Sequence, residues 1–138
     1  MKIASWNVNG IRARIEHVTT WIESNQPDVL ALQETKVMDE MFPFDVFASL
    51  GYQANIYGQK SYNGVALLSK EKPKVCKKGI DGFTDKQTRV ISGIYKDITI
   101  IDVYIPNGQS VGSEKFEYKM KWLKPVSYTH LTLPTTPY

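Results

Sequence analysis

Two apolar segments that each end in polar side chains, separated by one amphipathic segment, most constrain the fold of this chain. The first apolar segment, residues 2–8, runs into the sequence SWNVNG at 5–10, which contains Asn7. The second, residues 29–34, runs into LALQETK at 30–36, which contains Glu34. Over residues 14–25, apolar side chains recur at three- and four-residue spacing, which predicts a helix with one face against a sheet. A strand–helix–strand unit places its two strands parallel, with their carboxyl ends on the same side of the sheet.

The two polar strand ends predict a ligand site. If the two strands are immediate neighbours, Asn7 and Glu34 lie within a strand spacing or so, about 5 Å. Ligands of open α/β sheets bind outside the carboxyl ends of the strands. One carboxylate and one amide suit a hard cation with oxygen ligands, Mg²⁺ before Zn²⁺. On these residues alone an alternative stays open, in which Asn7 only begins a loop and Glu34 is a solvated strand end.

The rest of the chain predicts further α and β elements in one domain. A short helix is expected within residues 39–50, and another begins after Ser113, which caps it. Strands are expected at residues 52–58, 64–69, 73–78, 89–95 and 98–104.

Composition limits the class of partner and the compartment. Seventeen basic and fourteen acidic residues give a net charge of +3, which permits a polyanionic partner but is not a strongly basic footprint. The single cysteine, Cys76, excludes an internal disulfide and fits a reducing compartment. No apolar stretch approaches the length of a membrane span, and the amino terminus does not resemble a signal peptide. We therefore expect a cytoplasmic protein without a membrane partner.

The last fourteen residues differ in composition from everything before them. Residues 125–138 contain no Asp, Glu, Lys or Arg, but four threonines and three prolines. They begin where a helix is in progress, and they resemble an artefact peptide that follows misassembled sequencing reads. We expect residues 1–124 to be the native portion and residues 125–138 to be a non-native tail, so His130 is given no chemical role.

Six motifs occur in order along the chain: WNVNGIR at 6–12, PD at 27–28, QETK at 33–36, YNGVALLS at 62–69, RV at 89–90 and YIPNG at 104–108. Taken together, they resemble the exonuclease III family of bacterial apurinic/apyrimidinic endonucleases, within the endonuclease/exonuclease/phosphatase superfamily. The likeness covers essentially every residue up to about Lys124.

The resemblance implies a fold and a set of site residues. The implied fold is a four-layered α-β-β-α sandwich of the deoxyribonuclease I type, here only about its first half. Glu34 resembles the principal carboxylate ligand of Mg²⁺, for which Mn²⁺ is a possible substitute. Asn7 resembles the amide that lies beside the metal and orients a catalytic aspartate. Tyr104 resembles the active-site tyrosine whose hydroxyl faces the scissile phosphate.

The reaction that the resemblance implies is hydrolysis of a DNA phosphodiester, 5′ to an abasic sugar or stepwise from a 3′ end. The expected partner of the monomeric protein is double-stranded DNA with abasic sites or 3′ ends. Basic and amide side chains are expected to hold its phosphates, since an arginine fork suits a phosphate and lysine acts as a point charge. The candidates for DNA contact are Arg12, Lys36, Tyr62, Asn63, Arg89 and Asn107.

The sequence also departs from the family. The family's Gly-Asp-x-Asn segment, its second metal-handling aspartate and its Ser-Asp-His segment are not present here. We therefore expect this chain to be inactive as a nuclease, although its parent protein is a nuclease. We also expect the apolar faces of strands 64–69 and 89–104 to be left exposed, which would make the chain molten or prone to aggregation.

Two other functions compete with a DNA-repair nuclease. One is a phosphodiesterase or phosphatase of the same superfamily that acts on lipid or inositol phosphates. The other is a DNA-binding module without catalytic activity. The QETK motif at 33–36 and the YIPN sequence at 104–107 favour the DNA-repair branch, and the acidic Glu34 disfavours a module that binds phosphate without a metal.

Overall fold

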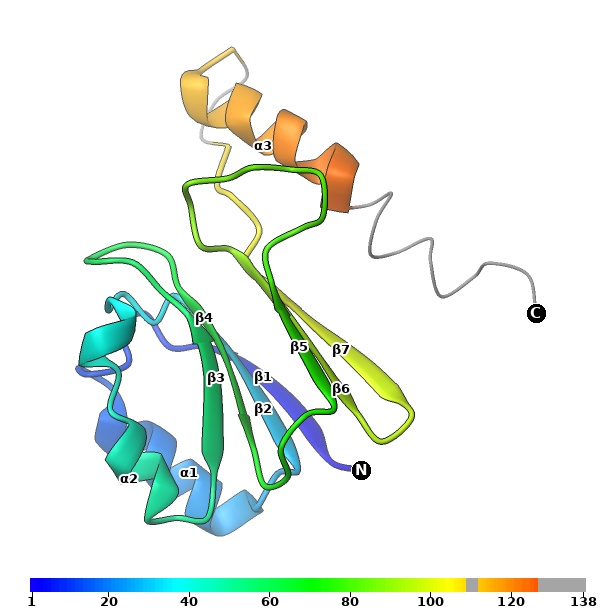
Figure 1. Cartoon of the computed structure of the whole chain (residues 1–138). Coiled ribbons are helices and arrows are strands. Elements are labelled where there is room, and N and C mark those ends of the chain that lie inside the picture. Colours follow the sequence, from blue (N-terminus) through cyan, green and yellow to red (C-terminus); the bar gives the residue numbers. More distant parts are fainter. Residues whose placement is uncertain (109–111, 127–138) are drawn as a thin grey trace.

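Two β-sheets lie face to face with helices on their outer sides (Figure 1). This arrangement is seen in a computed structural model that describes residues 1–108 and 112–126. The first sheet has the order β1-β2-β4-β3. Its strands are β1 (Ile3–Asn7), β2 (Val29–Gln33), β3 (Gln53–Tyr57) and β4 (Val65–Ser69).

The second sheet has the order β5-β6-β7 and is antiparallel throughout. Its strands are β5 (Val75–Lys78), β6 (Val90–Tyr95) and β7 (Ile98–Val103). Helices α1 (Ile15–Asn25) and α2 (Phe44–Ala48) cover the outer face of the first sheet, and α3 (Glu114–Val126) packs on the second sheet (Figure 1). In the described part of the chain, no helix is both long enough and apolar enough to cross a membrane.

The strand–helix–strand unit at the start of the chain is confirmed. Strands β1 and β2 are parallel neighbours, and the register places Asn7 opposite Gln33. Helix α1 ends at Asn25 and is capped by Gln26, whose N–H bonds to the carbonyl of Ile22 and whose left-handed backbone turns the chain out of the helix. The polar ends of β1 and β2 therefore lie side by side at one edge of the sheet, as predicted.

Three layers of apolar side chains hold these elements together. Val18 and Ile22 of α1 pack with Leu30 and Leu32 on one face of β2. The opposite face of the first sheet packs on the second sheet, through residues that include Val29, Ala31, Val65, Leu67, Ile91, Tyr95 and Ile100. A third cluster joins the second sheet to Trp122 and Val126 of α3. All four layers of the expected sandwich are therefore present.

The expected exposure of the facing sheet surfaces is wrong. Val65, Leu67 and Ile91 have no exposed surface, because β4 and β6 cover each other across the two sheets. Exposure remains at the β1 edge, where Ile3 is 46% exposed. The second sheet therefore covers the centre of the first sheet and leaves its β1 edge open.

Two boundaries differ from the sequence prediction. The helix expected within residues 39–50 is split into a 3₁₀ turn at Asp39–Met41 and α2. Pro43 explains the split, since a proline drives the preceding residue, Phe42, into an extended conformation. Helix α3 runs through Val126, past the expected tail boundary after Lys124, while residues 127–138 lie outside the described residues.

Candidate active site

Glu34 follows β2 directly, in a backbone conformation that few residues adopt. Its φ is +56°, in the left-handed region, and its carbonyl accepts a hydrogen bond of 2.7 Å from the N–H of Gly10. The N–H of Val8 bonds in the same way to the carbonyl of Gln33 at 3.0 Å. The loops that follow β1 and β2 therefore hold each other, and strained backbone of this kind is concentrated at functional sites.

Tyr104 brings the second sheet to the same place. It follows β7, and its hydroxyl donates a hydrogen bond to Oε1 of Glu34. Burial raises the pKa of Tyr104 to about 12, the bond to Glu34 acts in the same direction, and Arg89 opposes it. The phenol therefore stays protonated at neutral pH, and its hydrogen bond to Glu34 connects the carboxyl ends of β2 and β7.

A cavity of about 810 Å³ opens at this end of the sandwich. It collects seven of the nine side chains predicted for the site, namely Glu34, Lys36, Tyr62, Asn63, Arg89, Tyr104 and Asn107. Asn7 and Arg12 are not among its lining residues, and both are exposed on the β1 side of the site. The structure thus gathers residues that are far apart in the sequence, such as Glu34 and Tyr104, which are seventy positions apart.

The loop between β3 and β4 forms one wall of the cavity. Asn63 has a φ of +55°, and its amide nitrogen donates to Oε1 of Gln59 at 2.9 Å. The same oxygen accepts bonds from the N–H and the hydroxyl of Thr88. Gln59 therefore joins this loop to the segment before β6, while Tyr62 stands 70% exposed at the rim.

Gly64 makes the closest backbone approach in this wall. Its φ is +96°, and a Cβ added there would lie 2.1 Å from Oγ1 of Thr35. Its carbonyl accepts from the N–H of Thr35, and its own N–H bonds to the carbonyl of Thr88. The loop after Glu34 can therefore lie against the β3–β4 loop only because residue 64 has no side chain.

Arg89 is held from several sides. Its guanidinium carbon lies 4.7 Å from the ring centre of Tyr104 and 5.4 Å from that of Tyr118 on α3. Its Nε donates to Gln87 at 2.8 Å, and its Nη1 donates to the carbonyl of Tyr104 at 3.2 Å. Arg89 therefore contacts Tyr104 through both its ring and its carbonyl, as well as lining the cavity.

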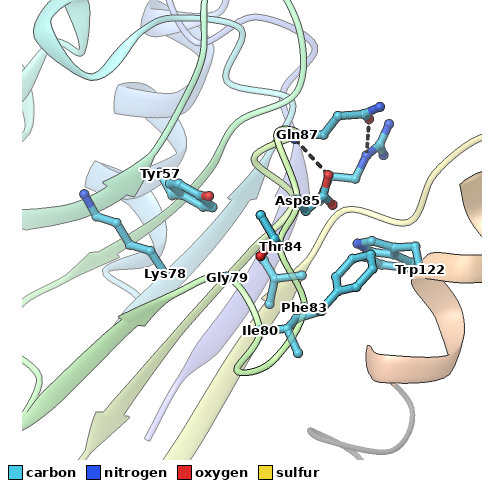
Figure 2. A pocket seen from close by; sticks show the side chains of 11 residues that line it. Tyr57, Lys78, Gly79, Ile80, Phe83, Thr84, Asp85, Gln87 and Trp122 are labelled. Atoms are coloured by element: carbon cyan, nitrogen blue, oxygen red, sulfur yellow. Dashed lines mark hydrogen bonds between the residues drawn. The ribbon is translucent and has the colours of Figure 1, made fainter.

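A second cavity, of about 210 Å³, lies beside the first and shares Gln87 and Arg89 with it. Figure 2 shows its lining, with Phe83 and Trp122 on one side and the bonds from Asp85 through Gln87 to the arginine on the other. Asp85 also accepts a 2.6 Å bond from the hydroxyl of Tyr118. The residues that line this smaller cavity therefore include the side chains that hold Arg89 in place, together with apolar side chains.

The side-chain oxygens at the β1–β2 edge are of the chemical kind that a magnesium ion takes as ligands. Oδ1 of Asn7 accepts from the N–H of Asn9, and Nζ of Lys36 donates to Oδ1 of Asn9 at 2.5 Å. Within residues 1–108 and 112–126, no three His, Cys, Asp or Glu side chains come close enough to hold a metal together. Mg²⁺ commonly keeps several waters and takes one or two carboxylates. The carboxylate of Glu34 and the amide of Asn7 match this coordination preference, so they are the candidate ligands.

Several cavity residues were missed by sequence reasoning. Gln59, Gln87, Lys115 and Tyr118 all line the cavity. Lys115 and Tyr118 lie three residues apart on α3, a spacing that indicates one helix face but not which cavity it borders. Gln59 and Gln87 lie in loops, where the sequence has no hydrophobic period to reveal their position. Only the packing of α3 and the loops shows that these four residues border the cavity.

These features define a class of protein: a four-layered α/β sandwich with a polar, oxygen-rich site at the end of its two sheets. The chain matches the Endonuclease/Exonuclease/phosphatase family over residues 4–136. It is 43% identical over 128 residues to exodeoxyribonuclease III of Haemophilus influenzae, a match that covers 88% of this chain and 48% of that protein. It is 34% identical to DNA repair nuclease APEX1 of Danio rerio, with 88% of this chain and 41% of that protein covered.

Solved structures show the same likeness. A 3′ phosphatase from Neisseria bound to a product DNA hairpin has a TM-score of 0.94 and 35% identity, covering 99% of this chain and 53% of that one. An AP endonuclease from Archaeoglobus fulgidus has a TM-score of 0.91 and 38% identity, covering 100% of this chain and 52% of that one. The chain belongs to the Endonuclease/Exonuclease/phosphatase family and spans about half the length of the curated relatives it matches.

Proposed function

We propose that the full-length protein with this amino-terminal half is a Mg²⁺-dependent DNA-repair nuclease. It would hydrolyse phosphodiesters 5′ to abasic sites, remove nucleotides from 3′ ends, or do both. The observation that carries this proposal is the meeting of Glu34 and Tyr104 at the end of the two sheets, inside a cavity lined by Lys36 and Arg89. The resemblance to exodeoxyribonuclease III and APEX1 agrees with it.

Each side chain has a task in the proposed reaction. Glu34 and Asn7 would hold the cation, which would supply positive charge that stabilises the negative charge of the reacting phosphate. Tyr104 keeps its proton at neutral pH and donates it in a hydrogen bond to Oε1 of Glu34, at the edge of the cavity. Lys36, Asn63, Arg89 and Asn107 bind phosphate oxygens from the cavity wall, Tyr62 packs against the backbone at the rim, and Arg12 contacts phosphate from the neighbouring loop.

The residues that would activate water are not supplied by this chain. In the resembled family they are an aspartate, with its asparagine, and a histidine from later segments. We therefore propose that the 138-residue chain does not cleave DNA, and that the full-length protein acts as a cytoplasmic monomer.

A phosphatase or phosphodiesterase acting on lipid or inositol phosphates remains the second candidate, because one superfamily holds both chemistries. The DNA branch is favoured by Tyr62, which stands 70% exposed at the cavity rim, where an extended polymer can pack against it. A DNA-binding module without catalysis is disfavoured by Glu34, because a carboxylate at the base of the cavity repels phosphate unless a cation lies between them.

A cleavage assay on matched substrates separates these candidates. The full-length protein is incubated with Mg²⁺ and duplex DNA carrying one abasic site, a recessed 3′ end or a 3′ phosphate, and in parallel with inositol phosphates. Nicking or 3′ processing of the duplexes that stops with EDTA supports the proposal. Release of phosphate from inositol phosphates alone contradicts it, and tight DNA binding without any cleavage favours the binding module.

A further inference from the structure

A buried carboxylate close to the candidate site has no role in the proposed reaction. In the described part of the chain, Asp102 on β7 is the one buried acidic residue, 2% exposed. Burial raises its pKa to about 7, and the side chain of Gln33 and the backbone N–H groups of Ala66 and Leu32 oppose the rise. Among the described residues, no group lies in good hydrogen-bond geometry with its Oδ2. A buried, incompletely bonded polar group costs stability, so its presence calls for an explanation.

Asp102 holds one particular side chain across the two sheets. Nε2 of Gln33, the last residue of β2, donates to Oδ1 of Asp102 at 2.7 Å. The same nitrogen donates to the hydroxyl of Ser5 on β1 at 3.0 Å. An amide nitrogen carries two hydrogens, and here they are directed toward β1 and β7. The amide of Gln33 thus joins three strands from two sheets.

The position of this link connects it to the site. Gln33 is the residue before Glu34, and Asp102 lies two residues before Tyr104, on the same face of the chain. The bond between Gln33 and Asp102 is therefore adjacent to the bond between Tyr104 and Glu34, and both run between the ends of β2 and β7. Fixing the amide of Gln33 fixes the backbone from which the carboxylate of Glu34 extends.

We infer that Asp102 is a positioning residue, which through Gln33 sets the place of Glu34 relative to Tyr104. This inference rests on the proposed nuclease function for its effect on rate. Asp102 does not contact substrate in this role. It requires an acceptor oxygen at Oδ1 rather than a charge, so asparagine is the conservative replacement and leucine removes the link.

The test uses Asp102→Leu, Asp102→Asn and Gln33→Met, with Asp97→Asn in the exposed β6–β7 turn as the matched surface control. In the full-length protein, we expect Asp102→Leu and Gln33→Met to lower kcat for abasic-site nicking about tenfold, with KM for DNA changed less than about twofold. Combining them should add little, because both break one link. Asp102→Asn should keep at least about half of the wild-type kcat.

A second readout does not depend on activity. In ¹⁵N NMR spectra of the 138-residue chain, we expect Asp102→Leu and Gln33→Met to move the backbone amide signal of Glu34, and Asp102→Asn to leave it near its wild-type position. Wild-type kcat in Asp102→Leu, equal loss in the leucine and asparagine variants, or an unmoved Glu34 signal would overturn the inference. If the wild-type protein itself does not cleave DNA, the proposed function fails, and the Glu34 signal alone decides whether Asp102 positions it.

Discussion

At the scale of single residues, the hydrogen bond between Tyr104 and Glu34 joins two sheets at the end where polar side chains gather. Neither partner is held alone: Arg89 lies against the ring of Tyr104, and the carbonyl of Glu34 is bonded to the N–H of Gly10. Supported side chains of this kind lose little freedom when substrate binds. Pre-organised groups are what the proposed hydrolytic site requires.

Asp102 predicts an unusual dependence of stability on pH. Its folded pKa of about 7 lies above the unfolded value of about 3.9, so the folded chain binds more protons between these limits. The free energy of unfolding should therefore fall as pH rises from 4 to 7, by about 1.4 kcal/mol per unit of pKa difference, and level off above pH 7.

Urea titrations of the wild type and Asp102→Asn at pH 5 and pH 8 measure this dependence. We expect the variant to lose less stability than the wild type over this interval, because asparagine does not ionise. Equal losses in the two proteins would show that Asp102 is not the residue that titrates. A variant that is more stable at pH 8 and still active would also separate charge from hydrogen bonding at this position.

The basic side chains around the cavity predict a salt dependence of DNA binding. Lys36→Gln and Arg12→Gln should each lower the slope of log K against log salt by about one unit, because each variant neutralises one phosphate fewer. Lys72→Gln is the control, because the register of β2 and β4 places the loop after β4 at the opposite end of the sheet. Binding isotherms of the full-length protein without Mg²⁺ at several salt concentrations give the slopes. Unchanged slopes for both variants would show that Lys36 and Arg12 are solvated surface residues that do not contact phosphate.

At the scale of elements, the loops after β2 and before β4 form one unit. The N–H of Lys36 bonds to the carbonyl of Asn63, and Gly64 bonds to both Thr35 and Thr88. Glu34, Lys36 and Asn63 each have a positive φ, at 56°, 58° and 55°. The wall of the site is therefore built from strained backbone that the paired loops hold in place.

Gly64→Ala tests this unit. The new Cβ would meet Oγ1 of Thr35 at 2.1 Å in addition to the cost of a φ of +96°, so we expect a loss of stability of about 1–3 kcal/mol or more. Gly51→Ala is the matched control, since φ there is +86° but no atom lies within 4 Å of the added Cβ. Denaturant titration of both variants isolates the steric part. If Gly64→Ala lost no more stability than Gly51→Ala, the close approach of residue 64 to Thr35 would not contribute to the free energy of unfolding.

The elements themselves were largely predictable from the sequence, because hydrophobic period marks strands and helices locally. The strands and the helices at 15–25 and 114–126 lie within a few residues of their predicted places. The polar ends of β1 and β2 also predicted that Asn7 and Glu34 lie at the same edge of the sheet, which the parallel register of β1 and β2 confirms. Their role in a site stays a prediction. The contacts of Gln33 with Asp102 and of Arg89 with Tyr118 were not predictable, since they depend on how two sheets and α3 pack.

At the scale of the whole molecule, the two sheets cover each other more fully than the sequence suggested. Burial of apolar area contributes about 25 cal/mol per Å², so the inter-sheet cluster is a main source of stability. The open part of the interface lies at β1, where Ile3 is 46% exposed. The buried inter-sheet cluster favours the folded state of this chain, although the β1 edge of the interface between the sheets is uncovered.

We therefore expect the 138-residue chain to unfold in one cooperative transition, in place of the molten behaviour that exposed sheet faces would produce. Circular dichroism followed through a thermal melt, with dye binding to exposed apolar surface as a second probe, measures this. Leu67→Ala, in the centre of the inter-sheet cluster, should lower the midpoint strongly. A broad transition with strong dye binding at low temperature would show that the inter-sheet cluster does not hold the chain in one folded state.

The most direct test of the proposed site compares Glu34→Ala with the wild type in the full-length protein. DNA binding and Mg²⁺-dependent nicking of an abasic duplex are measured on the same samples. Loss of the carboxylate should reduce nicking at least about a hundredfold, which corresponds to roughly 3 kcal/mol of barrier, while DNA binding stays largely intact. Wild-type turnover by Glu34→Ala at saturating Mg²⁺ would contradict the assignment of the end of the two sheets as the active site.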